Sequence, residues 1–132
     1  MALQVGGLHH LAIRVTDLNR AKQFYMQTLG FQHVLEVPGL VLLNANGTFL
    51  GIRGDAEETD AQDRFDPFRV GLDHLALAVP NGDALRELMR QLNDAGVPNN
   101  GIEDDPLLGA KYVSFYDPDG VAWELYAMPA SS

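Results

Sequence analysis

Leu8-His-His-Leu-Ala-Ile-Arg-Val15 returns later in the chain as Leu72-Asp-His-Leu-Ala-Leu-Ala-Val79. Both copies alternate between large apolar residues and smaller or polar ones, a pattern that predicts a half-buried β-strand. Each copy carries a histidine at the same point, His10 in the first and His74 in the second. An internal repeat of this kind predicts two copies of one structural unit.

A helix is expected after each of these strands. In the first copy Thr16 and Asp17 offer N-cap side chains, and helical spacing continues as far as Gly30. In the second copy Asn81 and Asp83 begin a helix that Gly96 closes. The residues at helical spacing are Ala21, Phe24, Tyr25, Thr28 and Leu29 in the first helix, and Ala84, Leu85, Leu88, Met89, Leu92 and Ala95 in the second.

Further strands are expected after each helix, because apolar or alternating runs bounded by Pro, Gly or Asn follow there. These runs span residues 31–37, 40–43 and 49–53 in the first copy, and residues 112–116 and 121–128 in the second. Asn44-Ala-Asn-Gly47 and Asp117-Pro-Asp-Gly120 occupy equivalent positions between the last two strands of each copy. Both are typical of hairpin turns in which Gly supplies a positive φ.

The sequence therefore predicts an α+β fold built from two βαβββ units in tandem. With 132 residues, the chain is expected to form a single domain. Unit one is expected to span about residues 5–54, an acidic connector 55–68, and unit two 69–128. If the two sheets lie side by side and curl, they form one mixed sheet with a central trough and the helices on the outside.

The connector is the most acidic part of the sequence, and its side chains are expected to form a solvated loop. A calcium-binding loop is the alternative, but the regular ligand spacing of such a loop is missing. The connector's carboxylates belong to Asp55, Glu57, Glu58, Asp60, Asp63 and Asp66.

Composition narrows the classes of function. The chain has no cysteine, which excludes disulfides, thiolate metal sites and a cysteine nucleophile. Its net charge of −9, without a basic cluster, argues against nucleic acid and against an anionic membrane surface as partners. No apolar run approaches the length of about 20 residues that spans a bilayer, and Met1–Gly7 lacks the pattern of a signal peptide. We expect a cytoplasmic protein whose partner is a small molecule.

Strand parity predicts that three possible metal ligands share one side of the sheets. Residues i and i+2 of a strand point to the same face, so His10 and His74 lie opposite the apolar residues that pack on the helices. In residues 121–128 Trp123 and Leu125 belong on the helix side, which turns Glu124 toward the face of the histidines. Two histidines and a carboxylate can hold a divalent metal ion.

Each of these side chains also has a simpler interpretation. A histidine in a strand is more often a hydrogen-bonded structural residue than a metal ligand. Glu124 is harder to explain in that way, because an unpaired carboxylate among apolar residues costs several kcal/mol. His9 has the opposite parity to His10 and is interpreted as a surface or strand-edge residue.

In their order and spacing, these motifs resemble those of the vicinal oxygen chelate superfamily, which contains glyoxalase I, the extradiol dioxygenases and the bleomycin-binding proteins. The resemblance covers nearly the whole chain. It rests on His10 to Leu18 with Phe24-Tyr25 and Leu29-Gly-Phe31, on Asp73 to Val79, and on Phe115 to Glu124.

The resemblance implies that His10, His74 and Glu124 bind one divalent metal ion, which is Fe, Mn, Ni, Co or Zn. Glyoxalase I has a fourth, acidic ligand in the last strand of its first unit. Setting Gly47 against Gly120 puts Gly51 opposite Glu124. The missing acid counts against glyoxalase I itself and leaves a three-ligand site with open coordination positions.

Other side chains of the same parity are candidates for the substrate. Arg53 is the preferred partner for an anionic substrate, because a guanidinium can hold a carboxylate or phosphate with two hydrogen bonds. Tyr126, two residues past Glu124, is the catalytic candidate and would donate a proton or a hydrogen bond. Surface or packing roles are the alternatives for both. The remaining candidates for substrate binding are Arg14, Tyr112 and Ser114.

The favoured function is a metal-dependent enzyme that acts on a small oxygenated substrate by dioxygenase, isomerase or lyase-type chemistry. The alternative is a metal-free module that binds a drug or metabolite, as the bleomycin-binding proteins do. Members of the superfamily commonly pair, and open sheet edges favour association. We therefore expect a homodimer, with the metal site built either within one chain or across two.

Overall fold

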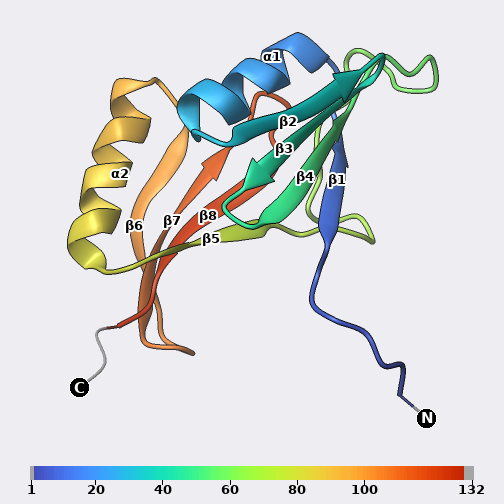
Figure 1. Ribbon diagram of the computed structural model, residues 1–132. Coiled ribbons are helices and arrows are strands. Elements are labelled where there is room, and N and C mark those ends of the chain that lie inside the picture. The colour runs from blue at the N-terminus through green and yellow to red at the C-terminus, as the bar shows by residue number, and fades with distance from the viewer. Residues whose placement is uncertain (1, 130–132) are drawn as a thin grey trace. The chain divides into compact units, whose positions relative to one another are not determined.

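The computed structural model describes residues 2–129, which form two compact units divided between Asp63 and Arg64. Each unit holds a four-stranded mixed sheet and a helical segment that follows the first strand (Figure 1). In each sheet the first and last strands of the unit pair in parallel, and the other pairs are antiparallel. The α+β prediction of two βαβββ units is confirmed.

The sheet of unit one has the strand order β1-β4-β3-β2. Its strands are β1 (His10–Arg14), β2 (Gln32–Val37), β3 (Leu40–Ala45) and β4 (Thr48–Arg53), and its helical segments are α1 (Leu18–Gln23) and η1 (Phe24–Thr28). The sheet of unit two has the equivalent order β5-β8-β7-β6. Its elements are β5 (Leu75–Val79), α2 (Gly82–Asp94), β6 (Asn99–Asp105), β7 (Ala110–Tyr116) and β8 (Ala122–Ala127).

The first helical segment differs from the continuous α-helix expected from its sequence. It begins as predicted, with the Asp17 side chain accepting a hydrogen bond from the Arg20 backbone. After Gln23 the helix widens into the π-helical turn η1, in which the Leu29 N–H donates to the Phe24 carbonyl. This turn surrounds Tyr25, whose side chain is fully buried. A π-helical turn accommodates one additional residue in the helix, which apolar spacing alone does not predict.

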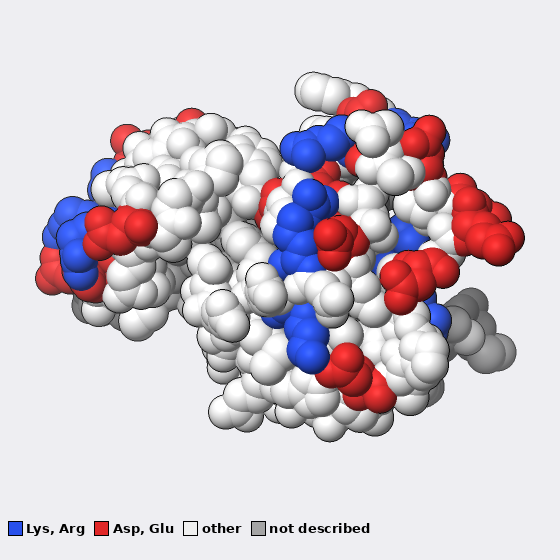
Figure 2. Space-filling view, turned by 90° about the horizontal axis from the view of Figure 1, so that it is seen from above, with Lys and Arg blue, Asp and Glu red and all other residues white. Residues whose placement is uncertain are grey.

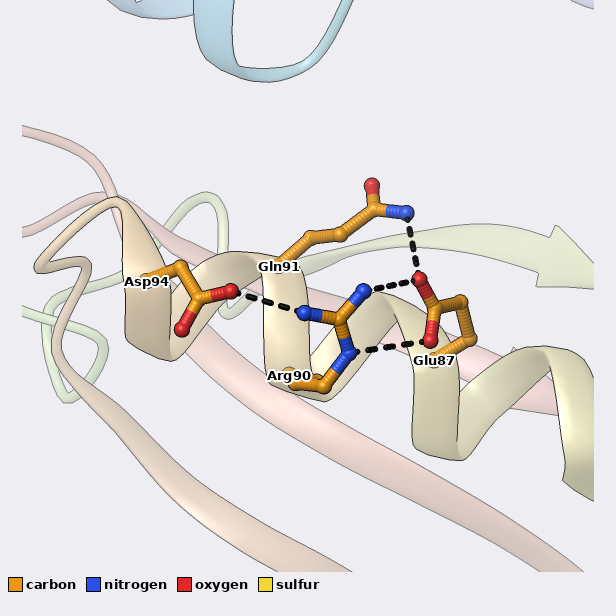
Figure 3. A network of polar contacts seen from close by, with 4 residues as sticks. All are labelled: Glu87, Arg90, Gln91 and Asp94. Atoms are coloured by element: carbon orange, nitrogen blue, oxygen red, sulfur yellow. Dashed lines mark hydrogen bonds and ion pairs between the residues drawn. The ribbon is translucent and has the colours of Figure 1, made fainter.

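The second helix forms as expected, with one face buried and the other charged. The Asn81 side chain accepts a hydrogen bond from the Ala84 backbone and so caps the N-terminus. On the exposed face, Arg90 donates hydrogen bonds to Glu87 and to Asp94, three and four residues away (Figure 3). Such pairs stabilise a helix locally, while its packing depends on the buried face. The buried residues of α2 are Leu85 and Leu92.

Both predicted hairpin turns are present. Between β3 and β4 a two-residue turn places Asn46 at φ 55° and Gly47 at φ 113°. Between β7 and β8 the Gly120 N–H donates to the Asp117 carbonyl at 2.9 Å. The buried Asp117 carboxylate also accepts hydrogen bonds from the Asp119 and Val121 backbones. This side chain therefore closes the turn.

Burial alternates along the strands as parity predicts. In β1 Ile13 is buried while His10, Ala12 and Arg14 are exposed. In β8 Trp123 and Leu125 are buried, with Glu124 between them on the other side. We call the side opposite these buried residues the open face of each sheet. The candidate site residues that lie in strands are on the open faces.

The surface shows acidic and basic side chains interspersed on the face drawn in Figure 2. Within residues 2–129, no helix combines the length and the apolar character needed to cross a membrane.

We predict that Leu43→Ala destabilises the protein by about 2–5 kcal/mol, because it removes a fully buried side chain from the helix side of β3. Leu42→Ala is the matched control: Leu42 is the adjacent residue on the open face and is only partly buried. Urea unfolding measures both. Equal losses for the two variants would contradict the assignment of faces.

Candidate functional site

The parallel pairing of β5 and β8 brings His74 and Glu124 together on the open face of unit two. In the register of this pair Ala76 lies beside Glu124, and His74 precedes β5 by one residue. The His74 Nε2 atom is 3.5 Å from Glu124 Oε1. Two of the three predicted metal ligands, 50 positions apart in the sequence, are therefore neighbours.

Glu124 is in an unfavourable place for a charge. Its side chain is 17% exposed, and this burial is the main cause that raises the pKa of its carboxyl group. His74 acts in the opposite direction and lowers the pKa of Glu124, whereas the nearby carboxylates of Asp105, Asp73 and Glu103 raise it. A positive charge at this point would stabilise the ionised form.

His74 is oriented by the residue before it. Its Nδ1 atom lies 2.6 Å from Asp73 Oδ1. Because a carboxylate only accepts hydrogen bonds, Nδ1 carries the proton and donates a hydrogen bond to Asp73. When His74 is neutral, its other ring nitrogen, Nε2, carries the lone pair on the side of Glu124.

His10 is the first residue of β1 in unit one, where its register partner in β4 is Phe49. Its Nδ1 atom lies 2.9 Å from Nδ1 of His9, and the two rings meet edge to face. His9 is exposed, as expected of a surface residue, and its ring contacts that of His10. His9 precedes the first residue of β1, so strand alternation does not apply to it.

Gly51 occupies the place in unit one that Glu124 occupies in unit two. The register pairs Ala12 with Gly51 in unit one and Ala76 with Glu124 in unit two. A Cβ atom at Gly51 would meet its nearest neighbours at 3.6 Å, which is ordinary van der Waals contact. The first unit thus lacks the acid at a position where the backbone has room for a Cβ atom.

The remaining candidates of unit two surround Glu124 on the open face. Ser114 is the register partner of Glu124 across β7 and β8, and Tyr112 is the partner of Tyr126. The two tyrosine rings stack with centroids 6.0 Å apart. The structure therefore gathers these three candidates beside Glu124.

The Tyr126 hydroxyl is already engaged by a carboxylate. It donates a hydrogen bond to Asp105 Oδ2 at 2.6 Å, and this bond is the main cause that raises the pKa of Tyr126 to about 12. The phenol is therefore protonated at neutral pH. Tyr112 is held similarly, because a hydrogen bond to Glu103 raises its pKa. Sequence reasoning missed both carboxylate partners, which lie on β6.

In unit one, Arg14 and Arg53 are register partners at the ends of the parallel strands β1 and β4. Both side chains are exposed. Arginines at neighbouring backbone positions on one open face are candidates for binding an anion.

Within residues 2–129, no three side chains among His, Asp and Glu are grouped closely enough to hold a metal ion. The structure brings together the pair of His74 and Glu124, and His10 belongs to the other unit. The pair fits a metal ion: ligand atoms each about 2.1 Å from a shared ion lie about 3.0–3.5 Å apart, and the observed separation is 3.5 Å.

The profile of the Glyoxalase/Bleomycin resistance protein/Dioxygenase superfamily matches residues 7–125. The chain belongs to this superfamily. It is 32% identical over 126 residues to the uncharacterized protein YwkD of Bacillus subtilis (strain 168), covering 90% of this chain and 94% of the relative.

Solved structures share the fold. The crystal structure of SMU.1112c is similar with a TM-score of 0.79 and 27% identity, covering 93% of this chain and 99% of that one. The lactoylglutathione lyase of Agrobacterium tumefaciens has a TM-score of 0.74 at 22% identity, covering 93% and 94% of the two chains. At that identity the likeness shows the fold alone.

We predict that Tyr126 titrates at a pKa of about 12, and that Asp105→Asn lowers this value toward the ordinary pKa of about 10 by removing the acceptor's charge. Ultraviolet titration of the phenolate, with Tyr126→Phe to identify its signal, measures the shift. Asp104→Asn is the control, because Asp104 bonds Lys111 instead. An ordinary value in the unchanged protein would contradict the hydrogen bond.

Proposed function

We propose that this member of the glyoxalase superfamily is a divalent-metal-dependent enzyme that acts on a small oxygenated substrate. His10, His74 and Glu124 are its proposed metal ligands, and the ion is Fe, Mn, Ni, Co or Zn. The observation that carries the proposal is the pair of His74 Nε2 and Glu124 Oε1, 3.5 Å apart on the open face of unit two.

The geometry of this pair favours two ligands over a salt bridge. A charge-assisted hydrogen bond between an imidazolium and a carboxylate is about 2.7–2.9 Å long, whereas this contact measures 3.5 Å. The Asp73 carboxylate already accepts from His74 Nδ1, so the ring needs no second carboxylate as a hydrogen-bond partner. A lone pair on Nε2 and a desolvated carboxylate face each other, which a shared cation would stabilise.

A divalent ion bound by two imidazoles and one carboxylate supplies Lewis acidity and open positions for two adjacent oxygens of a substrate. Gly51, in the place equivalent to Glu124, contributes no fourth ligand. We therefore favour dioxygenase, isomerase or lyase-type chemistry over that of glyoxalase I.

The chain's own side chains bind and orient the substrate in this proposal. Arg14 and Arg53 hold an anionic group with paired hydrogen bonds. Ser114 and Tyr112 flank Glu124 and Tyr126 through the β7–β8 register and contact the substrate's polar groups. Tyr126 is the proposed catalytic side chain. Because its pKa is raised to about 12, it keeps its proton at neutral pH. It would donate its hydrogen bond to the substrate in place of Asp105.

Metal content tests the proposal. Protein purified without a chelator or a histidine tag is expected to contain or take up about one equivalent of a divalent ion. His10→Ala, His74→Ala and Glu124→Gln should each weaken binding at least about tenfold, because each removes one ligand. Elemental analysis and titration of the apo-protein measure this, and His33→Ala, which removes a histidine bonded to Glu36 on β2, is the control.

Less than about a tenth of an equivalent, with no thermal shift on adding any of the five metals, would contradict metal binding. The protein would then be a metal-free binding module. In that event His74→Ala would leave ligand binding intact.

A further inference from the structure

In both units, the residue immediately before the proposed histidine ligand contacts that histidine's Nδ1 atom. In unit two the contact joins Asp73 Oδ1 to His74 Nδ1 at 2.6 Å. In unit one it joins the Nδ1 atoms of His9 and His10 at 2.9 Å. The two contacts use different chemical groups but engage the same atom of each histidine at the same position of the repeat.

These contacts determine which ring nitrogen is available. Asp73 accepts the Nδ1 proton of His74, so a neutral His74 has its lone pair on Nε2, the atom 3.5 Å from Glu124 Oε1. A free imidazole has no such constraint, and its proton exchanges between the two nitrogens. The carboxylate therefore holds the ring in the tautomer and orientation that binding through Nε2 requires.

In unit one the imidazole of His9, rather than a carboxylate, holds Nδ1 of His10 and so leaves Nε2 available. A hydrogen bond between two neutral histidines needs one proton between their Nδ1 atoms. Coordination through His10 Nε2 places that proton on His10 and leaves His9 Nδ1 as the acceptor. His9 is itself supported by Phe49 of β4, whose ring centroid is 5.7 Å away. The His9 carbonyl also accepts a hydrogen bond from the Phe49 backbone.

We propose that His9 and Asp73 are positioning residues that engage Nδ1 of His10 and His74 and so present Nε2 of both histidines to the metal ion. This inference rests on the proposed function, because it assumes that the two histidines are ligands. Outer contacts of this kind typically change metal affinity by about 10–100-fold. Neither residue is a ligand or a catalytic group.

The first test uses the metal-free protein and reads the tautomer directly. Two-bond proton–nitrogen correlation spectra of ¹⁵N-histidine-labelled protein are recorded at about pH 8.5, where an unperturbed histidine is neutral. His74 is expected as the Nδ1–H tautomer. Asp73→Ala should shift it toward Nε2–H, and Asp73→Asn, whose amide oxygen still accepts, should restore Nδ1–H. Asp73 is 76% exposed, so its replacement should leave the fold intact.

The second test measures the affinity of the apo-protein for Zn²⁺ and Co²⁺ against a competing chelator. Asp73→Ala and His9→Ala should each weaken binding about 10–100-fold, and Asp73→Asn and His9→Asn should recover most of the loss. His33→Ala and Glu58→Ala are the controls. His33 bonds Glu36 on β2, and Glu58 is exposed in the connector.

The inference is overturned if His74 is mainly Nε2–H in the unchanged protein, or if Asp73→Ala and His9→Ala bind metal as tightly as the controls. The proposed function, rather than this inference, fails if the His74 tautomer responds to Asp73 as expected but the unchanged protein binds neither Zn²⁺ nor Co²⁺.

Discussion

The parallel pairing between the first and last strands of each unit is the constraint on which the site depends. It sets Ala76 beside Glu124 and Ala12 beside Gly51, so that residues far apart in sequence occupy defined neighbouring places. In unit two this register brings His74 and Glu124 to 3.5 Å. A shift of β8 by one residue would turn Glu124 to the helix side and expose Trp123 and Leu125 on the open face. The buried face of each sheet therefore fixes the positions of the polar residues on its open face.

The two units have equivalent strand orders, so side chains at matching positions of the two units can be compared directly. Both retain a histidine at the start of the first strand and a hydrogen-bonding residue before it. Only the second has an acid at the position where the first has Gly51. A Cβ atom there would have ordinary contacts, so the backbone itself does not require a glycine. The asymmetry leaves one acid for two histidines, which is the ligand set proposed for a site with open coordination positions.

Much of this arrangement follows from sequence, because alternation and repetition are local patterns. The repeat predicted two βαβββ units, and parity placed Glu124 opposite Trp123. β6 (Asn99–Asp105) was not located in the sequence, because its only large apolar residue is Ile102. Its carboxylates were missed with it, including Asp105, which holds the Tyr126 hydroxyl. The contact between His9 and His10 was also missed, because His9 lies before β1 and strand alternation does not predict where its side chain points.

The central proposal is that His10 and His74 bind the same ion. X-ray absorption spectroscopy of the metal-loaded protein tests this claim most directly, because the fine structure reports the number of imidazole ligands. We expect two imidazoles in the unchanged protein, one in His10→Ala and one in His74→Ala, with nitrogen or oxygen ligands at about 2.0–2.2 Å if the ion is zinc. An imidazole count that is unchanged by His10→Ala would contradict the account.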